Sequence, residues 1–177
     1  MELIGGAIAV LFAWRYGYST QLAAGLVFGW ALLALTFIDL DTQLLPDDIT
    51  LPLLWAGLIV AALRWNSTTL PQALWGAVAG YVSLWLIYKG FKLLTGKEGM
   101  GYGDFKLFAA LGAWFGWQAL VPIILMASVI GAVVGIAMKF STGLREGGYV
   151  PFGPFLAGAG LTAMIFGPAS ILGVIGL

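Results

Sequence analysis

Five aspartates are the residues of this chain best suited to carry chemistry. Asp39 and Asp41 follow a long uncharged stretch, Asp47 and Asp48 lie a few residues further on, and Asp104 stands where another apolar stretch begins. The chain contains no histidine and no cysteine, which excludes serine–histidine and cysteine–histidine catalysis, zinc–thiolate sites and disulfides. The chemistry therefore has to come from carboxylates, lysines, hydroxyls or backbone groups, and neither a metal nor a cofactor is expected.

The composition predicts that these carboxylates belong to a membrane protein. Of the 177 residues, 61% are hydrophobic and only 9% are charged, whereas a soluble domain carries about 25% charged residues. Eight basic and eight acidic residues balance, so no net field attracts nucleic acid. We expect one membrane-embedded domain over residues 1–177, with the lipid bilayer as its surroundings.

Seven uncharged stretches are candidates for membrane-spanning helices, which need about 20 apolar residues each. They are Leu3–Trp14, Gln21–Ile38, Ile49–Leu63, Leu70–Tyr88, the two parts of Leu107–Met138, and Gly147–Leu177. Gly116-Trp117-Gln118 and Pro122 are the residues that divide Leu107–Met138. Gly167-Pro168 offers a similar break in the last stretch, so eight spans are the alternative to seven. The sequence thus predicts an all-α, polytopic transmembrane helical bundle.

The basic residues predict how this bundle is oriented. If the spans alternate, six of the eight basic residues lie on one side, and only Arg15 and Arg64 lie on the other. The first side is then cytoplasmic and holds the connections Asp39–Asp48, Lys89–Lys106 and Lys139–Val150. The N-terminus is cytoplasmic in this arrangement, and with seven spans the C-terminus lies outside.

This topology brings carboxylates from different helices to one depth at the cytoplasmic side. Asp39 directly follows an apolar segment, and an ionisable side chain at membrane depth is costly and marks a functional site. Gly101 and Gly103 permit an unusual backbone before Asp104 and the close approach of another segment. Residues two apart on a helix face different directions, so either Asp39 or Asp41, but not both, is expected to meet Asp104.

The other charged residues have simpler explanations. Asp47 and Asp48 are expected to be solvated residues near a helix end, or caps for the helix that follows. Together with Asp41, they could instead attract a basic substrate segment. Lys106 could bias the carboxylate pair electrostatically, but we expect it to anchor its helix at the membrane interface.

The acidic segments together resemble a known family. Ile38-Asp39, Leu44-Leu45-Pro46-Asp47 and Thr50-Leu51-Pro52 resemble the first aspartate segment of the type IV prepilin peptidases. Gly101-Tyr102-Gly103-Asp104-Phe105-Lys106-Leu107 resembles their second segment, the Gly-x-Gly-Asp signature shared with preflagellin peptidases and presenilins. Pro151-Phe152-Gly153-Pro154-Phe155 is similar to a further segment near the family's last helix. The order and spacing match, and the resemblance covers essentially the whole chain.

This resemblance implies an intramembrane aspartic endopeptidase with Asp39 and Asp104 as the catalytic pair. In such a pair, the ionised carboxylate takes a proton from water, which attacks the scissile carbonyl, while the protonated carboxyl donates to the carbonyl oxygen. The candidates for substrate binding or site support, from charge and motif position together, are Asp41, Asp47, Asp48, Gly101, Gly103, Lys106, Pro151 and Gly153.

The implied substrates are the prepilins and pseudopilins of type IV pili and type II secretion. These carry a short basic leader, commonly cut at a Gly-Phe junction, and the implied location is the bacterial cytoplasmic (inner) membrane. Full-length members usually begin with another helix and a cytoplasmic region, which often has two Cys-x-x-Cys pairs and is linked to N-methylation of the trimmed pilin. Because this sequence has no cysteine and passes into apolar residues at Leu3, we expect a peptidase core without methyl transfer.

A small ion- or proton-coupled transporter is the alternative from a different class, because carboxylates at membrane depth also serve ion pathways. The position of the carboxylates discriminates between the two. A coupling site is expected near the middle of the membrane, whereas Asp39 and Asp104 are predicted at its cytoplasmic edge.

Overall fold

The computed structural model describes residues 2–96, 100–142 and 151–174. Within these ranges all regular structure is helical, which confirms the predicted all-α fold. The helices are α1 (Glu2–Tyr16), α2 (Thr20–Thr42), α3 (Asp47–Ala62), α4 (Leu70–Thr95), α5 (Tyr102–Phe115), the short 3₁₀ helix η1 (Trp117–Ala119), α6 (Leu120–Thr142), α7 (Gly153–Phe166) and α8 (Pro168–Val174).

Local sequence explains where several of these helices begin and end. Ser19 adopts an extended backbone before α2, and its hydroxyl accepts a hydrogen bond from the N–H of Leu22 at 3.2 Å. Before α4, the N–H of Thr69 donates to Oε1 of Gln72 at 3.1 Å, as in a capping box. Gly96 ends α4 with a φ of 70°, which glycine adopts without a steric penalty.

The predicted breaks in the apolar stretches coincide with glycines of positive φ. Gly116 (φ 81°) separates α5 from η1, as expected. Gly167 (φ 86°) separates α7 from α8, so the expectation of one long final span is wrong and the alternative break is present. At seven residues, α8 is too short to cross a bilayer.

Three helical stretches are long and apolar enough to cross a membrane: Thr20–Thr42, Leu70–Thr95 and Trp117–Met138. The remaining helices α1, α3, α5 and α7 coincide with predicted spans but have only 14–16 residues, so the number of spans stays a prediction. Large apolar side chains such as Trp30, Leu86 and Val133 are exposed on the outside of the bundle. Extensive exposed apolar surface of this kind is typical of lipid contact, and the protein is a membrane protein.

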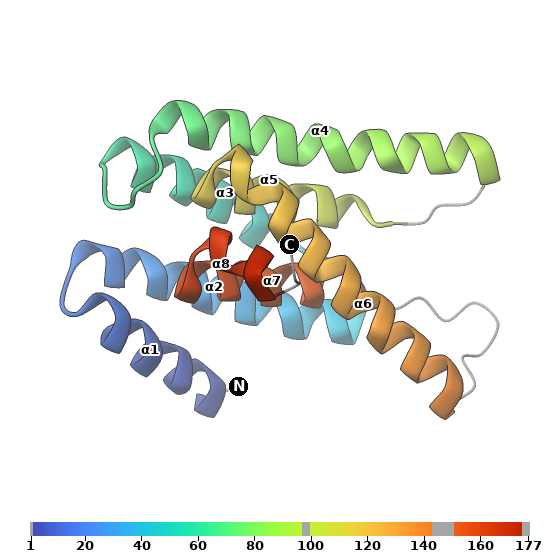
Figure 1. The fold of residues 1–177 in the computed structure, drawn as a ribbon, viewed down its shortest axis with the longest axis horizontal. Helices are drawn as coiled ribbons and strands as arrows, with labels where there is room; N and C mark the ends of the chain where they lie inside the picture. Colours follow the sequence, from blue (N-terminus) through green and yellow to red (C-terminus); the bar gives the residue numbers. More distant parts are fainter. Residues whose placement is uncertain (1, 97–99, 143–150, 175–177) are drawn as a thin grey trace.

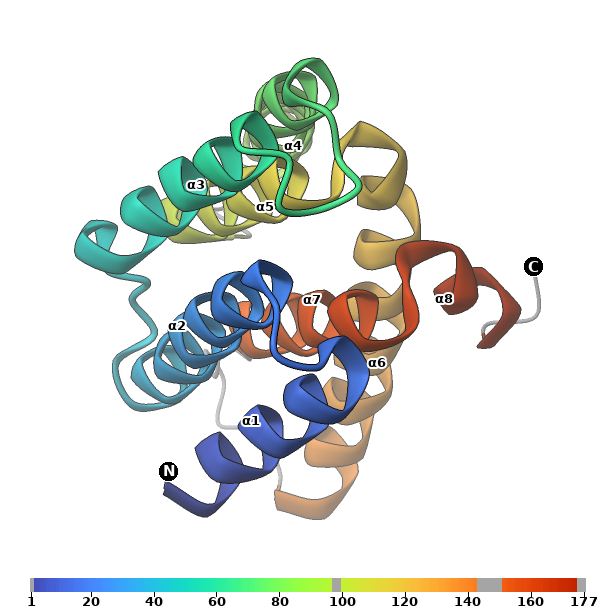
Figure 2. The same cartoon turned by 90° about the vertical axis from the view of Figure 1, so that its left-hand side faces the viewer.

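The helices form two packed groups, seen on opposite sides of the bundle in Figure 2. Helices α3, α4 and α5 pack together in one group, and α1, α2 and α7 pack together in the other. The groups meet where α5 contacts α7 and where α2 contacts α3, while α6 lies against α7 and α8. Helices α2 and α4 end, and α5 begins, toward the same end of the molecule, on the right in Figure 1.

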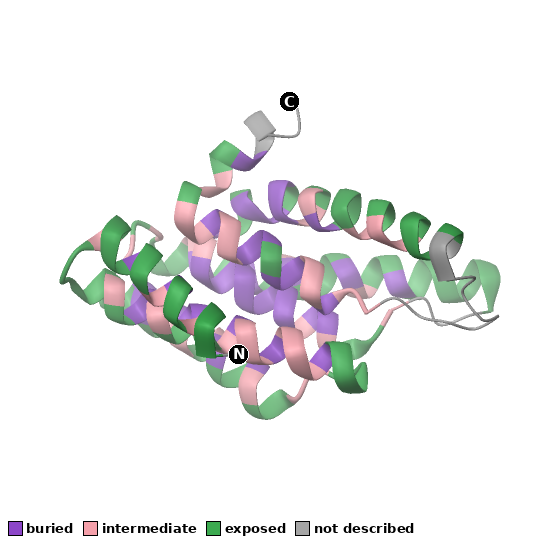
Figure 3. Ribbon diagram, turned by 90° about the horizontal axis from the view of Figure 1, so that it is seen from below, coloured by how far each residue is buried: buried purple, intermediate pink, exposed green. Residues whose placement is uncertain are grey.

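Helix α5 lies at the centre of the bundle and is buried along almost its whole length. Figure 3 shows the buried residues along the middle of the bundle and the exposed residues on its outer helices. Helix α4 approaches α5 closely because glycines lie at the contact. A Cβ on Gly76 would overlap the carbonyl of Gly112, and one on Gly80 would lie 2.7 Å from the carbonyl oxygen of Phe108. This close packing sets the position of α5 and of the aspartate in its first turn.

Candidate active site

Asp39 lies in the last turn of α2 and is only 5% exposed. The helix ends when Gln43 adopts a φ of 57°, and the Gln43 N–H donates to the Asp39 carbonyl oxygen at 2.9 Å. The Asp39 carboxylate faces the backbone N–H of Gly153, the first residue of α7. Such a helix N-terminus favours a negative charge. The carboxylate atom Oδ2 is buried and has no hydrogen-bond partner among the described residues.

Asp104 occupies the first turn of α5 and is 7% exposed. Gly101 precedes the helix with an extended backbone, and its N–H faces the Asp104 carboxylate, three residues on. An interaction between the side chain of the third helical residue, here Asp104, and the N–H of the N-cap residue is one of the two hydrogen bonds of a capping box. Asp104 also lies close enough to Asp39 to interact with it electrostatically. The structure therefore brings these two carboxylates together at one end of the bundle, each beside a helix N-terminus.

Leu45 packs against both helix N-termini, in the connection between α2 and α3. A Cβ on Gly103 would lie 2.6 Å from Cβ of Leu45, and a Cβ on Gly153 would lie 3.2 Å from Cδ1 of the same side chain. The Cβ on Gly153 would also lie 2.5 Å from Oδ2 of Asp39. Neither glycine has a positive φ, so both are required by space rather than by backbone conformation. Sequence reasoning did not single out Leu45, although it lies inside the motif that carries the family resemblance.

Asp41, the competing residue for the first carboxylate, is exposed, as is Asp48. The structure thus places Asp39, and not Asp41, beside Asp104. Pro151 is half-buried and lies two residues before Gly153 at the start of α7. Pro46 occupies the N-cap of α3, so neither Asp47 nor Asp48 is the cap residue, but both lie in the first turn, where a helix favours negative charge.

Asp47 and Lys106 form an ion pair, which corrects two expectations. The ammonium nitrogen of Lys106 lies 2.6 Å and 2.7 Å from the two carboxylate oxygens of Asp47. Asp47 is therefore not simply solvated, and Lys106 links α5 to α3 rather than only anchoring its own helix. Within the residues that the structure describes, no three acidic, His or Cys side chains group as a metal site would.

The sequence profile of the type IV leader peptidase family matches residues 26–136, which include Asp39 and Asp104. This chain belongs to the type IV leader peptidase family. The resemblance seen in the two aspartate segments is thereby confirmed.

Curated relatives from several bacteria carry the name prepilin leader peptidase/N-methyltransferase. The proteins from Stutzerimonas stutzeri, Aeromonas hydrophila and Pseudomonas aeruginosa are 52%, 50% and 49% identical to this chain over 167 residues. Each alignment covers 94% of this chain but 57% of the relative, so the chain spans little more than half the length of these proteins. No solved structure matches the chain.

Proposed function

We propose that residues 1–177 form the membrane-embedded peptidase domain of a type IV leader peptidase, with Asp39 and Asp104 as its catalytic carboxylates. The observation that carries the proposal is the pairing of these two buried carboxylates from different helix groups. Two buried carboxylates that interact electrostatically resist simultaneous ionisation, so one keeps a proton while the other accepts one.

The pair is suited to hydrolysis of a peptide bond. The ionised carboxylate removes a proton from a water molecule, whose oxygen adds to the scissile carbonyl carbon. The protonated carboxyl donates its proton to the carbonyl oxygen, and the carbon–nitrogen bond then breaks as the amine takes up a proton. Oδ2 of Asp39 supports this role because, among the described residues, no donor occupies it as an acceptor.

The proposed substrate is a prepilin or pseudopilin, as the name of the relatives indicates for those proteins. Its apolar helix is expected to lie among the apolar helices of the bundle, with the leader junction at the aspartates. Asp41 and Asp48 are exposed near the pair and are available to attract a basic leader, whereas Asp47 is already neutralised by Lys106.

The position of the aspartates does not favour the transporter alternative. Asp39 lies in the last turn of α2 and Asp104 in the first turn of α5, so both are at helix ends rather than near the middle of a span. A coupling site is expected close to the midplane of the membrane.

The decisive experiment is incubation of purified protein with a prepilin, read as the mass of the cleaved pilin. Asp39→Asn and Asp104→Asn should each reduce cleavage to background, because each removes one member of the proton-sharing pair. Asp41→Asn and Asp48→Asn are the matched controls, since both carboxylates are exposed, and they should retain most of the activity. Normal cleavage by a folded Asp104→Asn variant would end the aspartic peptidase proposal.

We propose that the aspartate end of the bundle faces the cytoplasm in the bacterial inner membrane. Among the described residues, Lys89, Lys92 and Lys106 lie toward that end, and Arg15 and Arg64 lie toward the other. Single cysteines at positions 67 and 97 test this orientation in a chain without native cysteine. A membrane-impermeant thiol reagent added outside should label position 67 and leave position 97 unlabelled. The reverse pattern would invert the orientation.

A further inference from the structure

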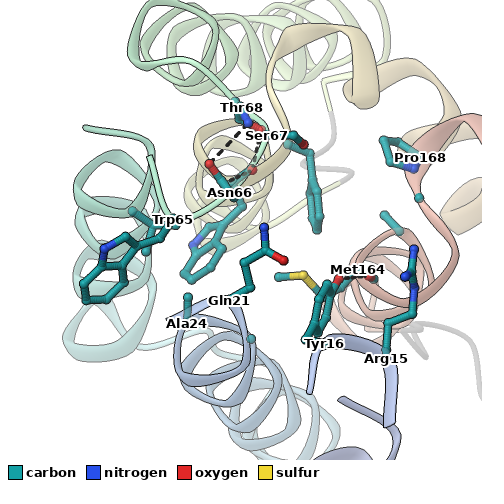
Figure 4. A pocket seen from close by; sticks show the side chains of 16 residues that line it. Arg15, Tyr16, Gln21, Ala24, Trp65, Asn66, Ser67, Thr68, Met164 and Pro168 are labelled. Carbon is teal, nitrogen blue, oxygen red and sulfur yellow. Dashed lines mark hydrogen bonds between the residues drawn. The ribbon is translucent and has the colours of Figure 1, made fainter. Parts of the chain in front are cut away.

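A pocket of about 380 Å³, drawn in Figure 4, is lined by residues at the helix ends opposite to those that carry the aspartates. Its lining comes from the end of α1, the start of α2, the end of α3 with the connection to α4, the end of α5, and the junction of α7 and α8. Pockets for small ligands have volumes of roughly 300–1,000 Å³, so this one has room for a lipid headgroup or a molecule of similar size. The aspartate pair does not contribute to its lining, so a ligand here would bind independently of any peptidase activity.

The pocket lies at the depth where lipid headgroups meet the membrane core. Of its lining residues, Gln21 is in the first turn of α2, and Ser67 lies just before α4. Both helices are long and apolar enough to cross the membrane, so their ends mark its surface. Trp14, Tyr18 and Trp65 are exposed at the same end, and aromatic residues of these types are enriched at the membrane interface.

Several polar side chains of the lining already donate hydrogen bonds to carbonyl oxygens in the last turns of helices. The side chains of Asn66 and Thr68 donate to the carbonyl oxygen of Trp114, at 3.1 Å and 3.0 Å. The Tyr16 hydroxyl donates to the carbonyl oxygen of Met164. These hydrogen bonds hold the shape of the pocket, and the ligand-binding donors have to come from other residues.

Arg15 and Gln21 supply such donors. Arg15 lines the pocket, and its Nε donates to the carbonyl oxygen of Ile165 at 3.2 Å, a contact that uses one of the five N–H donors of a guanidinium. Gln21 points its side-chain amide into the middle of the pocket in Figure 4. The described lining residues include no Asp and no Glu, so an anion meets one full positive charge and no negative one.

Below these polar groups the lining is apolar, with Ala24, Val60 and Met164 among its residues. We propose that this pocket binds an anionic phospholipid, whose phosphate is held by Arg15 and Gln21 and whose first acyl carbons contact these three side chains. Guanidinium groups pair well with phosphate oxygens. A zwitterionic lipid is disfavoured, because its cationic group would enter a lining that already holds Arg15 and offers no carboxylate.

The test measures the thermal unfolding of detergent-solubilised protein with added short-chain phosphatidylglycerol or phosphatidylcholine. A lipid that binds only the folded state raises the melting temperature as its concentration rises. Phosphatidylglycerol should raise it well above any effect of phosphatidylcholine. Arg15→Gln should need about tenfold more phosphatidylglycerol for the same shift, the usual cost of losing a charge-assisted contact.

Arg64→Gln is the matched control, because Arg64 carries the same charge at the same end but does not line this pocket. It should respond to phosphatidylglycerol like the unaltered protein. Equal losses in the Arg15 and Arg64 variants would show general surface attraction and overturn the proposal. Equal shifts with phosphatidylcholine, or with inorganic phosphate alone, would also overturn it, the latter by identifying a soluble phosphate as ligand.

Gln21→Leu provides a second variant in case Arg15→Gln unfolds when its hydrogen bond to Ile165 is lost. It keeps the size of the side chain, removes its amide donors, and should weaken the phosphatidylglycerol response severalfold. An unchanged response would remove Gln21 from the site and, if Arg15→Gln also binds normally, end the proposal. The comparison of phosphatidylglycerol with phosphatidylcholine on the unaltered protein tests the proposal even if both variants fail to fold.

Discussion

At the aspartate end of the bundle, neighbouring segments meet through glycines and one leucine, whereas at the opposite end side-chain hydrogen bonds close the helices. Gly103 and Gly153 leave just enough room for Leu45, and Oδ2 of Asp39 is left buried without a partner among the described residues. At the other end, by contrast, one backbone carbonyl, that of Trp114, accepts hydrogen bonds from two side chains.

This difference indicates that the aspartate end is arranged for chemistry and the opposite end for stability. A buried polar atom without a partner costs about 1–3 kcal/mol, so a fold keeps one only where it serves another purpose. The Trp114 carbonyl oxygen at the opposite end accepts two hydrogen bonds and so has no unused acceptor capacity. Substitutions that displace either buried carboxylate are therefore expected to alter cleavage, and those that remove hydrogen bonds at the opposite end to alter stability.

Among substitutions that keep both aspartates, the largest effect is expected for Gly153→Ala. Its methyl group would lie 2.5 Å from Oδ2 of Asp39 and must displace that carboxylate. Because displacements of about 1 Å cost about 100-fold in rate, prepilin cleavage should fall by at least that factor. Gly158→Ala, in the same helix with no atom within 4 Å of the new methyl group, should cleave normally. Equal rates for the two variants would refute this account of Gly153.

The two glycines of the Gly-x-Gly-Asp motif should differ in their tolerance of alanine. A methyl group on Gly103 would lie 2.6 Å from Cβ of Leu45, whereas one on Gly101 meets only Oδ2 of Asp104, at 3.7 Å. We expect Gly103→Ala to lower the cleavage rate by about tenfold or more and Gly101→Ala to have little effect. Initial rates at a fixed prepilin concentration measure both, and the opposite ranking would show that backbone conformation, not space, makes the motif glycine-rich.

Asn66→Ala tests the opposite end. The substitution removes the hydrogen bond to the Trp114 carbonyl and the one that Asn66 Oδ1 accepts from the N–H of Thr68 at 3.2 Å. The free energy of unfolding should fall by about 1–2 kcal/mol, because the Thr68 hydroxyl still satisfies the carbonyl oxygen. The cleavage rate of the folded protein should not change. Reversible unfolding in mixed detergent measures the first quantity and a prepilin assay the second. A large loss of cleavage at unchanged stability would contradict the division between the two ends.

The smallest effect is expected for Lys106→Met, which breaks the ion pair with Asp47. Both side chains are partly exposed, and such pairs contribute about 0–1 kcal/mol. Cleavage should stay within about threefold of normal, because the pair joins α3 to α5 without touching the two catalytic candidates. A loss of more than tenfold would instead assign Lys106 a direct electrostatic action on Asp104.

Much of the fold was predictable because its signals are local. Uncharged stretches coincide with α1 to α7, and Gly116 and Gly167 interrupt them where the chain breaks. Because the chain has no histidine and no cysteine, carboxylates were the leading candidates for catalytic groups. The Gly-x-Gly-Asp motif that ends at Asp104 indicated the family. These properties depend on neighbouring residues in the chain, so no knowledge of packing was needed to read them.

From the sequence, only the family resemblance favoured Asp39 over Asp41. In the tertiary structure, the packing of α2 against α7 buries Asp39 and leaves Asp41 exposed. The pairing of Asp47 with Lys106, 59 residues apart, likewise follows no local pattern. Leu45 acquires its place only when the starts of α5 and α7 converge on it. In each case the deciding contact joins segments distant in sequence, and which of them meet is set by how the two helix groups pack.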